Sequence, residues 1–456
     1  MSASHAPRLE DARDFTVPAA VHVTEHMSMS VFDGVSELVA TITAMLLLVS
    51  EQQLGKFLRG PLAGRSPDDR AEFLVKMNRA FVSMVETAYP TGWLNIIQLA
   101  HKAAAKTLKS VAGLMQAEYN PVEAASFRVD LWESFFEAAH ALIASPHVQV
   151  ERFGAQKRSV VEAMNDNIRG DMADLVLAMW SALAELRPAE SQQGKPNYQG
   201  VFGFQLVGYI LDLAMVDHEA VRKCAIQILY DMFCNRYIRD GNVADFEAVF
   251  IAKLDKAVMS GLKGDDTIRR HLISELTRKF REQQGIDSGV CPAGFRFVAS
   301  VDQLFQLLLD VRSLPETEEY DEERMVGTLK VMRFISHIQQ DVVYVKYVHL
   351  LAQMQLRNQN YLEAAQTLKM HSNLLAWDPD EQLTAVPELA LPAQTAFDRK
   401  EHLFKQMTNH FNEGKGWEMA IQACKELINQ YETKVFQYQK VADVSEQLAT
   451  FYRSIM

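Results

Sequence analysis

The sequence has 456 residues, more than one compact core usually holds, so we expect two or more domains or one elongated array. Hydrophobic residues make up 48% and charged residues 23%, a balance that excludes a disordered or a collagen-like chain. The net charge of −12 argues against nonspecific nucleic-acid binding, because a phosphate backbone needs a basic surface to release its counterions.

The N-terminal region does not have the pattern of a secretory signal. Residues 1–25 are polar and include Asp, Arg and Glu, so we expect them to be poorly ordered and the chain to be cytoplasmic. The longest apolar run, Leu38–Val49, is much shorter than the roughly 20 residues that span a bilayer. We interpret this run as a buried helix and expect no membrane insertion.

The first clear helix start lies at Ser66. Its hydroxyl can cap a helix, Pro67 suits the first helical position, and the two aspartates that follow suit the positive end of the helix dipole. We expect this helix to end at Tyr89-Pro90. Apolar side chains recur within it at steps of three and four residues, at Phe73, Leu74, Met77, Phe81, Met84 and Val85. One face of this helix must therefore pack on a neighbour.

The same pattern continues to residue 314, and only 21 glycines and 14 prolines interrupt the whole chain, which favours an all-α fold. We expect further helices at Trp93–Tyr119, Pro121–Ser145, Val160–Leu186, Gly203–Val216, Glu219–Arg236, Val243–Ser260, Asp265–Gln284 and Phe297–Leu314. Helices of this length with brief connections favour stacked antiparallel pairs. We therefore predict an α-solenoid of the HEAT or armadillo type over residues 26–320.

Two polar stretches interrupt this array. Pro188–Gln199 is expected to be a loop, and the acidic stretch Pro315–Glu323 is expected to be a domain boundary. A second domain is accordingly predicted over residues 321–456.

Two helical hairpins are predicted in this second domain, with their helices at Val342–Arg357, Tyr361–Trp377, Glu401–Phe411 and Trp417–Tyr431. The second helix of each hairpin opens with an aromatic residue that is followed three positions later by alanine. A small residue at that point lets two helices approach closely, as in tetratricopeptide repeats. We therefore predict tetratricopeptide-like hairpins.

The last part of the chain shows an apolar line that continues to the final residues. We expect one helix, or two nearly collinear helices, running to Met456. Because the pattern is still strong where the sequence stops, the chain looks like a fragment. The candidate surface for dimerisation or partner binding comprises Tyr431, Val435, Tyr438, Val441, Val444, Leu448, Phe451 and Tyr452. The alternative is that this stripe belongs to the core and is covered by the preceding hairpin.

The sequence contains no recognisable catalytic motif. It has no Gly-x-x-x-x-Gly-Lys-Ser/Thr phosphate loop and no Gly-x-Ser-x-Gly elbow. His218-Glu219 lacks the second helical histidine of a zinc site, and four scattered cysteines suit neither a disulfide framework nor a zinc site. We predict no catalytic, cofactor-binding or metal-binding residues.

Two C-terminal motifs carry a family resemblance. They are Asn360–Ala365, with the sequence Asn-Tyr-Leu-Glu-Ala-Ala, and Phe411–Ile421, with the sequence Phe-Asn-Glu-Gly-Lys-Gly-Trp-Glu-Met-Ala-Ile. Both resemble the opening of the Dock homology region 2 of the dedicator-of-cytokinesis family of guanine nucleotide exchange factors, most closely the subfamily that acts on Rac. A weaker resemblance upstream, which includes Tyr89-Pro90-x-x-Trp93, extends over the helical array.

This resemblance implies a function for the chain. In the family, the first lobe of the exchange region is a helical scaffold that helps to form a homodimer, whereas later lobes bind a Rho-family GTPase and expel its nucleotide. Residues 342–456 resemble only the first lobe. The chain is thus expected to be the scaffold and dimerisation segment of a Rac-type exchange factor. It would reach the GTPase only through lobes that this sequence lacks, and an adaptor protein is a possible further partner. The alternative is a free-standing helical-repeat adaptor that binds proteins and has no exchange activity.

Overall fold

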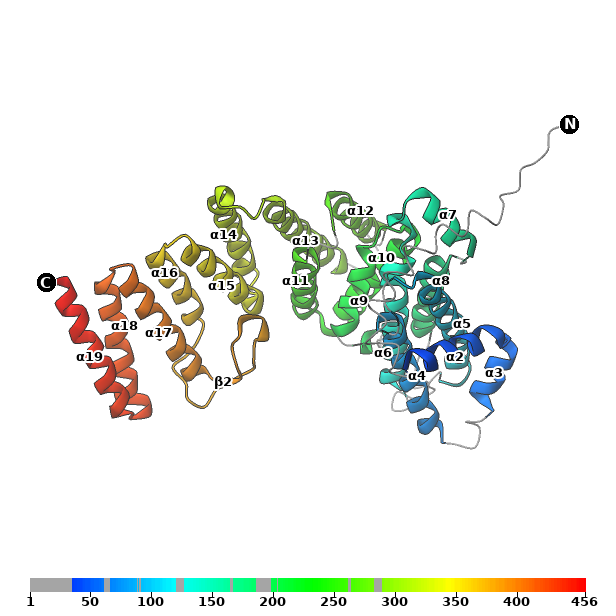
Figure 1. Cartoon of the computed structure of the whole chain (residues 1–456), viewed down its shortest axis with the longest axis horizontal. Coiled ribbons are helices and arrows are strands. Elements are labelled where there is room, and N and C mark those ends of the chain that lie inside the picture. The colour runs from blue at the N-terminus through cyan, green and yellow to red at the C-terminus, as the bar shows by residue number, and fades with distance from the viewer. Residues whose placement is uncertain are drawn as a thin grey trace. The chain divides into compact units, whose positions relative to one another are not determined.

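A computed structural model describes residues 35–60, 66–87, 89, 92–119, 127–164, 167–185, 198–202, 204–260, 264–282 and 289–456. Within these ranges the chain is almost entirely α-helical, which confirms the predicted fold class (Figure 1). The described sheet consists of two antiparallel two-residue strands, β1 (Gln382–Leu383) and β2 (Gln394–Thr395), with Gln382 opposite Thr395. The predicted poorly ordered segment 1–25 lies outside the described residues, as does most of the predicted loop Pro188–Gln199.

The described chain divides into two compact units, and each is considered separately. The first comprises residues up to 298 except 258–261, and the second comprises 258–261 and 299–456. The predicted domain boundary between residues 320 and 321 falls inside the second unit and stays a prediction.

The first unit is a stack of helices that carries three short 3-10 helices, η2 (Pro146–Val148), η3 (Val150–Arg152) and η4 (Tyr198–Val201). Its α-helices are α2 (Val35–Leu48), α3 (Glu51–Arg59), α4 (Pro67–Thr87), α5 (Leu94–Glu118), α6 (Val129–Ala144), α7 (Ala155–Met164), α8 (Ile168–Glu185), α9 (Phe204–Ala214), α10 (Glu219–Asp240), α11 (Ala244–Met259) and α12 (Asp266–Glu282). The N-terminal part of α13 (Val290–Ser313) also belongs to it.

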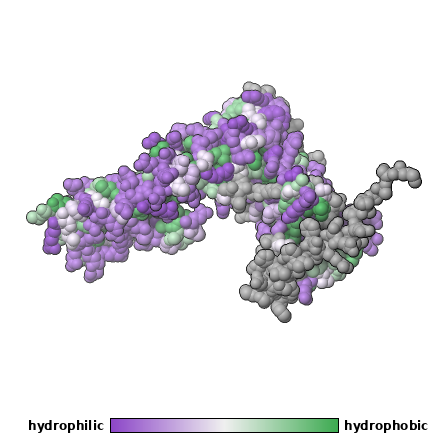
Figure 2. All heavy atoms as spheres, turned by 45° about the horizontal axis from the view of Figure 1, so that its top comes forward, coloured by the Kyte–Doolittle hydropathy of each residue, from purple (hydrophilic) through white to green (hydrophobic). Residues whose placement is uncertain are grey.

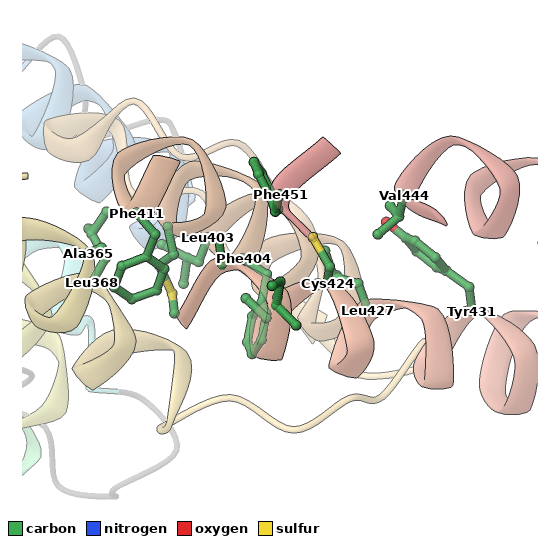
Figure 3. Packing of buried hydrophobic residues seen from close by; sticks show 14 of the residues in the cluster. Ala365, Leu368, Leu403, Phe404, Phe411, Cys424, Leu427, Tyr431, Val444 and Phe451 are labelled. Atoms are coloured by element: carbon green, nitrogen blue, oxygen red, sulfur yellow. The ribbon is translucent and has the colours of Figure 1, made fainter. Parts of the chain in front are cut away.

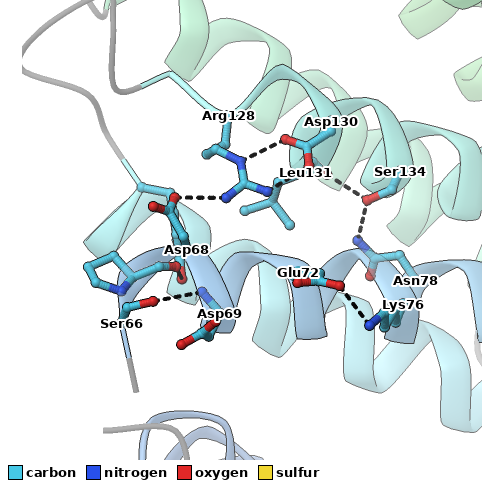
Figure 4. Close-up of polar contacts among 12 residues, drawn as sticks. Ser66, Asp68, Asp69, Glu72, Lys76, Asn78, Arg128, Asp130, Leu131 and Ser134 are labelled. Atoms are coloured by element: carbon cyan, nitrogen blue, oxygen red, sulfur yellow. Dashed lines mark hydrogen bonds and ion pairs between the residues drawn. The ribbon is translucent and has the colours of Figure 1, made fainter. Parts of the chain in front are cut away.

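The predicted start of α4 is confirmed. The hydroxyl of Ser66 accepts a hydrogen bond from the backbone N–H of Asp69 at 3.1 Å, and Pro67 is the first helical residue (Figure 4). α4 then packs against α6, where Asn78 Nδ2 donates to Ser134 Oγ at 3.1 Å inside the interface. Because both residues are buried, this bond prevents the loss of free energy that an unpaired buried amide would cause.

One helix prediction in the first unit is wrong. The segment Val160–Leu186 is not one helix, because α7 ends at Met164 and α8 begins at Ile168. Asn167 caps the new helix, and its Oδ1 accepts a hydrogen bond from the N–H of Gly170 at 3.0 Å. Asparagine favours such a cap over a helix interior.

Aromatic side chains fill the core of the first unit. Phe136 of α6 lies 6.2 Å from Trp180 of α8 and 5.8 Å from Phe202, as measured between ring centroids. Burying one such phenylalanine contributes about 1.5–3 kcal/mol to stability. A second group, Phe233, Phe250, Phe280 and Phe297, joins α10, α11, α12 and α13. These contacts satisfy the apolar stripes that predicted a helical stack.

α2 is a helix, as predicted, but it is not buried. Leu38 is 60% exposed and Leu48 is 86% exposed, and Ile42 and Met45 between them are exposed too. The apolar run alone could not reveal that α5 covers only one side of this helix. Lys106 of α5 secures its C-terminal end, because its Nζ donates to the carbonyl oxygens of the three α2-end residues Leu46 (3.0 Å), Leu47 (3.0 Å) and Val49.

The second unit is a succession of helices in which each packs on the next (Figure 1). After the end of α13 they are η5 (Glu318–Tyr320), α14 (Asp321–His337), α15 (Asp341–Arg357), α16 (Tyr361–Ser372), η6 (Pro387–Leu389), α17 (Ala396–Glu413), α18 (Trp417–Gln430), the π-helical turn η7 (Tyr431–Val435) and α19 (Tyr438–Ile455). Both predicted hairpins are present. The apolar pattern does not predict α14, whose first turn coincides with the acidic stretch.

Two boundaries in this unit differ from prediction. α16 ends at Ser372, so Trp377 lies in the following connection, where its ring centroid is 5.1 Å from those of Phe397 and Phe404. α17 begins at Ala396 instead of Glu401, because Thr395 caps it by accepting a hydrogen bond from the N–H of Asp398 at 3.0 Å.

The turns between helices in the second unit share one backbone geometry. A non-glycine residue adopts a positive φ in four of them, with φ of 58° at Gln339, 60° at Gln359, 57° at Lys415 and 53° at Phe436. In the first three turns, the N–H of the following residue bonds to the carbonyl five positions earlier, as between Asn360 and Gln355 at 2.8 Å. This structural repeat is not visible as a sequence period.

Hydrophilic side chains dominate the face in Figure 2, with hydrophobic ones scattered between them. Within the part of the chain that the structure describes, no single helix is long and apolar enough to cross a membrane, although the bent pair 37–48 and 51–59 passes that test by length and composition.

Candidate partner surface

The candidate surface lies at the C-terminal end of the second unit, where the prediction of one helix or two collinear helices is wrong. The chain reverses at Phe436, whose φ is 53°, and α19 packs back against α18 (Figure 1). The N–H of Gln437 donates to the carbonyl of Tyr431 at 3.1 Å and closes the turn. No glycine or proline marks this reversal, and the apolar spacing is the same for a straight helix as for a hairpin.

This reversal distributes the predicted surface residues among three environments. Tyr431, Val444 and Phe451 are buried in one core with side chains of α17 and α18, among them Phe404 and Leu427 (Figure 3). Three more pack partly buried against that core, namely Val435, Val441 and Leu448. Only Tyr438, 67% exposed, and Tyr452, 46% exposed, project mainly into solvent. A partner surface on this element therefore depends on these two tyrosines.

The two exposed tyrosines lie on the same side of α19 as two of the partly buried residues. At about 100° per residue, Tyr438, Tyr452, Val441 and Leu448 fall within roughly 80° of the helix circumference. We call these four residues the α19 face. Sequence reasoning missed Phe436, which is exposed at the turn two residues before Tyr438, because nothing in the apolar period indicated the reversal there.

A buried carboxylate fixes α19 in place. The side chain of Glu401 on α17 is 7% exposed, and it accepts hydrogen bonds from Lys440 Nζ at 2.9 and 3.0 Å, from Tyr431 Oη at 2.9 Å and from Lys405 Nζ. Burial by itself would raise the pKa of Glu401, but the bonds from Lys405, Lys440 and Tyr431 outweigh it and lower that pKa. The charged form of Glu401 is therefore the one that this network stabilises.

Other candidate positions have structural roles. The Nδ1 atom of His218 accepts a hydrogen bond from the N–H of Val221 at 3.4 Å and caps α10. Cys224, Cys291 and Cys424 are buried, Cys234 is half-buried, and none of the four forms a disulfide. Among the described residues, no group of three or more His, Cys, Asp or Glu side chains is placed to hold a metal ion.

Comparison with known proteins assigns both units. Residues 20–276 match a family model of the dedicator of cytokinesis (DOCK) TPR region, and residues 328–456 match one of lobe A of DHR-2. The chain belongs to the dedicator-of-cytokinesis family. This result confirms the family that the C-terminal motifs indicated. The α19 face lies within the part that matches lobe A.

Individual relatives agree with this assignment. The chain is 30% identical over 399 residues to dedicator of cytokinesis protein 3 of Homo sapiens, covering 86% of this chain and 19% of the relative. It is 26% identical over 426 residues to dedicator of cytokinesis protein 4 of Homo sapiens, covering 93% and 20%. The chain thus spans about a fifth of the length of the curated relatives it matches. A solved circular tandem repeat protein is similar at only 14% identity and a TM-score of 0.23, which supports no argument.

Proposed function

We propose that this chain is the scaffold and dimerisation segment of a guanine nucleotide exchange factor for Rho-family small GTPases of the Rac type, acting in the cytoplasm. The observation that carries this proposal is the match of residues 328–456 to lobe A of DHR-2. The alternative is an adaptor with no connection to exchange factors. We favour it less, because the chain belongs to the DOCK family.

Dimerisation would use the α19 face. Tyr438 and Tyr452 expose large rings beside the partly buried Val441 and Leu448, and aromatic side chains of this kind are enriched in the centres of protein interfaces. Lys425 Nζ lies 5.7 Å from the ring centroid of Tyr452 and adds a cation at the edge of the face. A second copy of the chain would cover the rings with its own α19 face in a twofold arrangement.

Light scattering coupled to gel filtration tests the dimer. We expect the double variant Tyr438→Ser/Tyr452→Ser to raise the dimer dissociation constant about tenfold or more, which corresponds to about 1.4 kcal/mol. Tyr320→Ser, which alters an exposed tyrosine on η5, is the matched control and should leave the constant unchanged. A chain that is monomeric at every concentration would contradict dimerisation through this element.

Exchange activity is a separate part of the proposal. The part of the exchange region that this chain matches is lobe A, which we propose to be a scaffold. We therefore expect this chain alone not to accelerate the release of fluorescent GDP from Rac. Clear acceleration by the purified chain would overturn the scaffold assignment, whatever its oligomeric state.

A further inference from the structure

A groove of about 530 Å³ lies between the C-terminal turns of α13 and the first half of α14, within the second unit. Three apolar side chains line it, Leu307 from α13, Leu314 directly after the end of α13, and Val326 from α14. Val326 is 52% exposed although it is aliphatic, and the two leucines are half-buried. The groove therefore leaves apolar surface in contact with water.

α14 approaches α13 closely at Gly327, which lines the groove. A Cβ atom at Gly327 would lie 2.9 Å from Cγ2 of Val311, so any larger residue there would force Val311 or one of the helices to shift. Val311 is buried at that contact. The adjacent residues on the solvent side then form the two walls.

Those walls are acidic. Asp310 of α13 faces the groove from one side, Glu322 and Glu323 of α14 from the other, and Lys330 is the one cationic residue in the lining. Glu322 and Glu323 form no ion pair with any described residue, whereas the exposed Glu318 and Glu319 of the connecting segment lie outside the lining. The groove consequently has an excess of negative charge.

Helix stability accounts for only part of this charge. Carboxylates in the first turn of α14 interact favourably with its dipole, which is sufficient reason for Glu322 and Glu323. Asp310 is different, because it lies in the last turn of α13, where a carboxylate is unfavourable. Its Oδ1 accepts a hydrogen bond from Gln306 Nε2 at 2.7 Å, but that neutral donor does not compensate its charge.

We propose that this groove binds a basic amphipathic helical segment of a partner protein. Apolar side chains of the segment would lie on Leu307, Leu314 and Val326, and its Lys or Arg side chains would reach Asp310, Glu322 and Glu323. Nucleic acids and anionic membranes are disfavoured by the same charge. The wall from Leu307 to Leu314, at the C-terminal end of α13, extends about 10 Å, so the groove accommodates about two turns of helix. This surface is separate from the α19 face and adds a binding function to the proposed scaffold.

Fluorescence anisotropy with a labelled peptide tests the proposal on the whole chain. The probe is a helical peptide of about 14 residues, ~20 Å long, with Leu on one face and Lys on the other. The comparison peptide has Glu in place of each Lys. We expect micromolar binding of the Leu/Lys peptide, weakening as salt rises, and no binding of the Leu/Glu peptide.

Variants separate the groove from general attraction to an acidic protein. Glu322→Gln/Glu323→Gln should weaken binding about tenfold, whereas Glu318→Gln/Glu319→Gln removes the same charge from the neighbouring exposed segment and should change it less than about twofold. Val326→Ser should weaken binding several-fold without altering the charge. Equal effects of the two charge variants, an unaffected Val326→Ser variant, or absence of binding by the Leu/Lys peptide would each overturn the proposal. Circular dichroism checks that every variant keeps its helix content.

Discussion

The phenol of Tyr431 donates a hydrogen bond to Oε1 of Glu401 at 2.9 Å, and this bond joins residues 30 positions apart in the buried interior of the second unit. Tyr431 begins the π-helical turn that reverses the chain, and Glu401 lies on α17. Burial, followed by the adjacent carboxylate of Glu401, raises the pKa of Tyr431, so its proton stays in the bond. The reversal is therefore attached to α17 through one side-chain pair, which Lys440 of α19 extends.

Tyr431→Phe should lower the free energy of unfolding by about 1–2 kcal/mol, because it removes one donor from a buried carboxylate while keeping the ring. Urea denaturation followed by circular dichroism measures this change. Tyr438→Phe makes the same chemical change at an exposed tyrosine of α19 and should alter stability by less than about 0.5 kcal/mol. Equal losses in the two variants would show that the bond to Glu401 contributes nothing specific.

Acid should destabilise the second unit through a pair of histidines. Nε2 of His349 lies 2.9 Å from Nδ1 of His371, and burial, then His349 and Arg399, lowers the pKa of His371 to about 3. Burial, then His402, also lowers the pKa of His349. The unfolded histidines, with an ordinary pKa near 6.5, bind protons that the folded ones do not. Stability should thus be complete above about pH 6.5 and should fall below it by up to about 1.4 kcal/mol per pH unit for each histidine.

Unfolding measured at several pH values between 7.5 and 5 checks this dependence. His371→Gln should make stability less sensitive to pH, even if the variant is less stable overall. His337→Gln changes an exposed histidine of α14 and should leave the pH dependence unchanged. A wild-type slope that persists in His371→Gln would contradict the assignment.

Thiol reactivity should follow burial. Burial raises the pKa of Cys224 to about 12 and that of Cys424 to about 11, so neither forms appreciable thiolate near pH 8. Iodoacetamide should therefore modify the half-buried Cys234 first in the native chain, with Cys224 and Cys424 modified only after unfolding. Mass spectrometry of peptides after timed labelling measures the order. Early modification of Cys424 would indicate that the α17–α18 core opens readily.

In the second hairpin, formed by α17 and α18, the close contact between the helices should not tolerate a larger side chain. Ala420 of α18 is fully buried, so Ala420→Leu would overpack the core and cost about 1–3 kcal/mol or more. Ala442→Leu adds the same atoms to an exposed position of α19 and should be nearly neutral. Thermal unfolding compares the two. A neutral Ala420→Leu would mean that the alanine three residues after Trp417 is not required for packing.

Sequence periodicity predicts where helices lie, because an apolar stripe must be buried, but it does not identify the covering surface. This explains why α4 starts at the predicted Pro67, whereas the exposed side of α2 at Leu38 was not foreseen. The same reason applies to the candidate surface, where Val444 and Phe451 face α17 and α18 and not solvent. The reversal at Phe436 was unpredictable because an aromatic residue with positive φ has no sequence signature. The bond from the N–H of Gln437 to the carbonyl of Tyr431, whose side chain is buried, closes the turn around this exposed residue.

The neighbour-by-neighbour packing from α14 to α19 has a consequence for cooperativity. When each helix depends mainly on the two beside it, unfolding can start at an end and advance by single helices, and local stability becomes a graded property along the chain. Amide exchange should accordingly be fastest in α19 and slowest near α16 and α17. A molecule that binds α19 would therefore slow amide exchange most in α19 itself. It would slow exchange less in each helix further from α19.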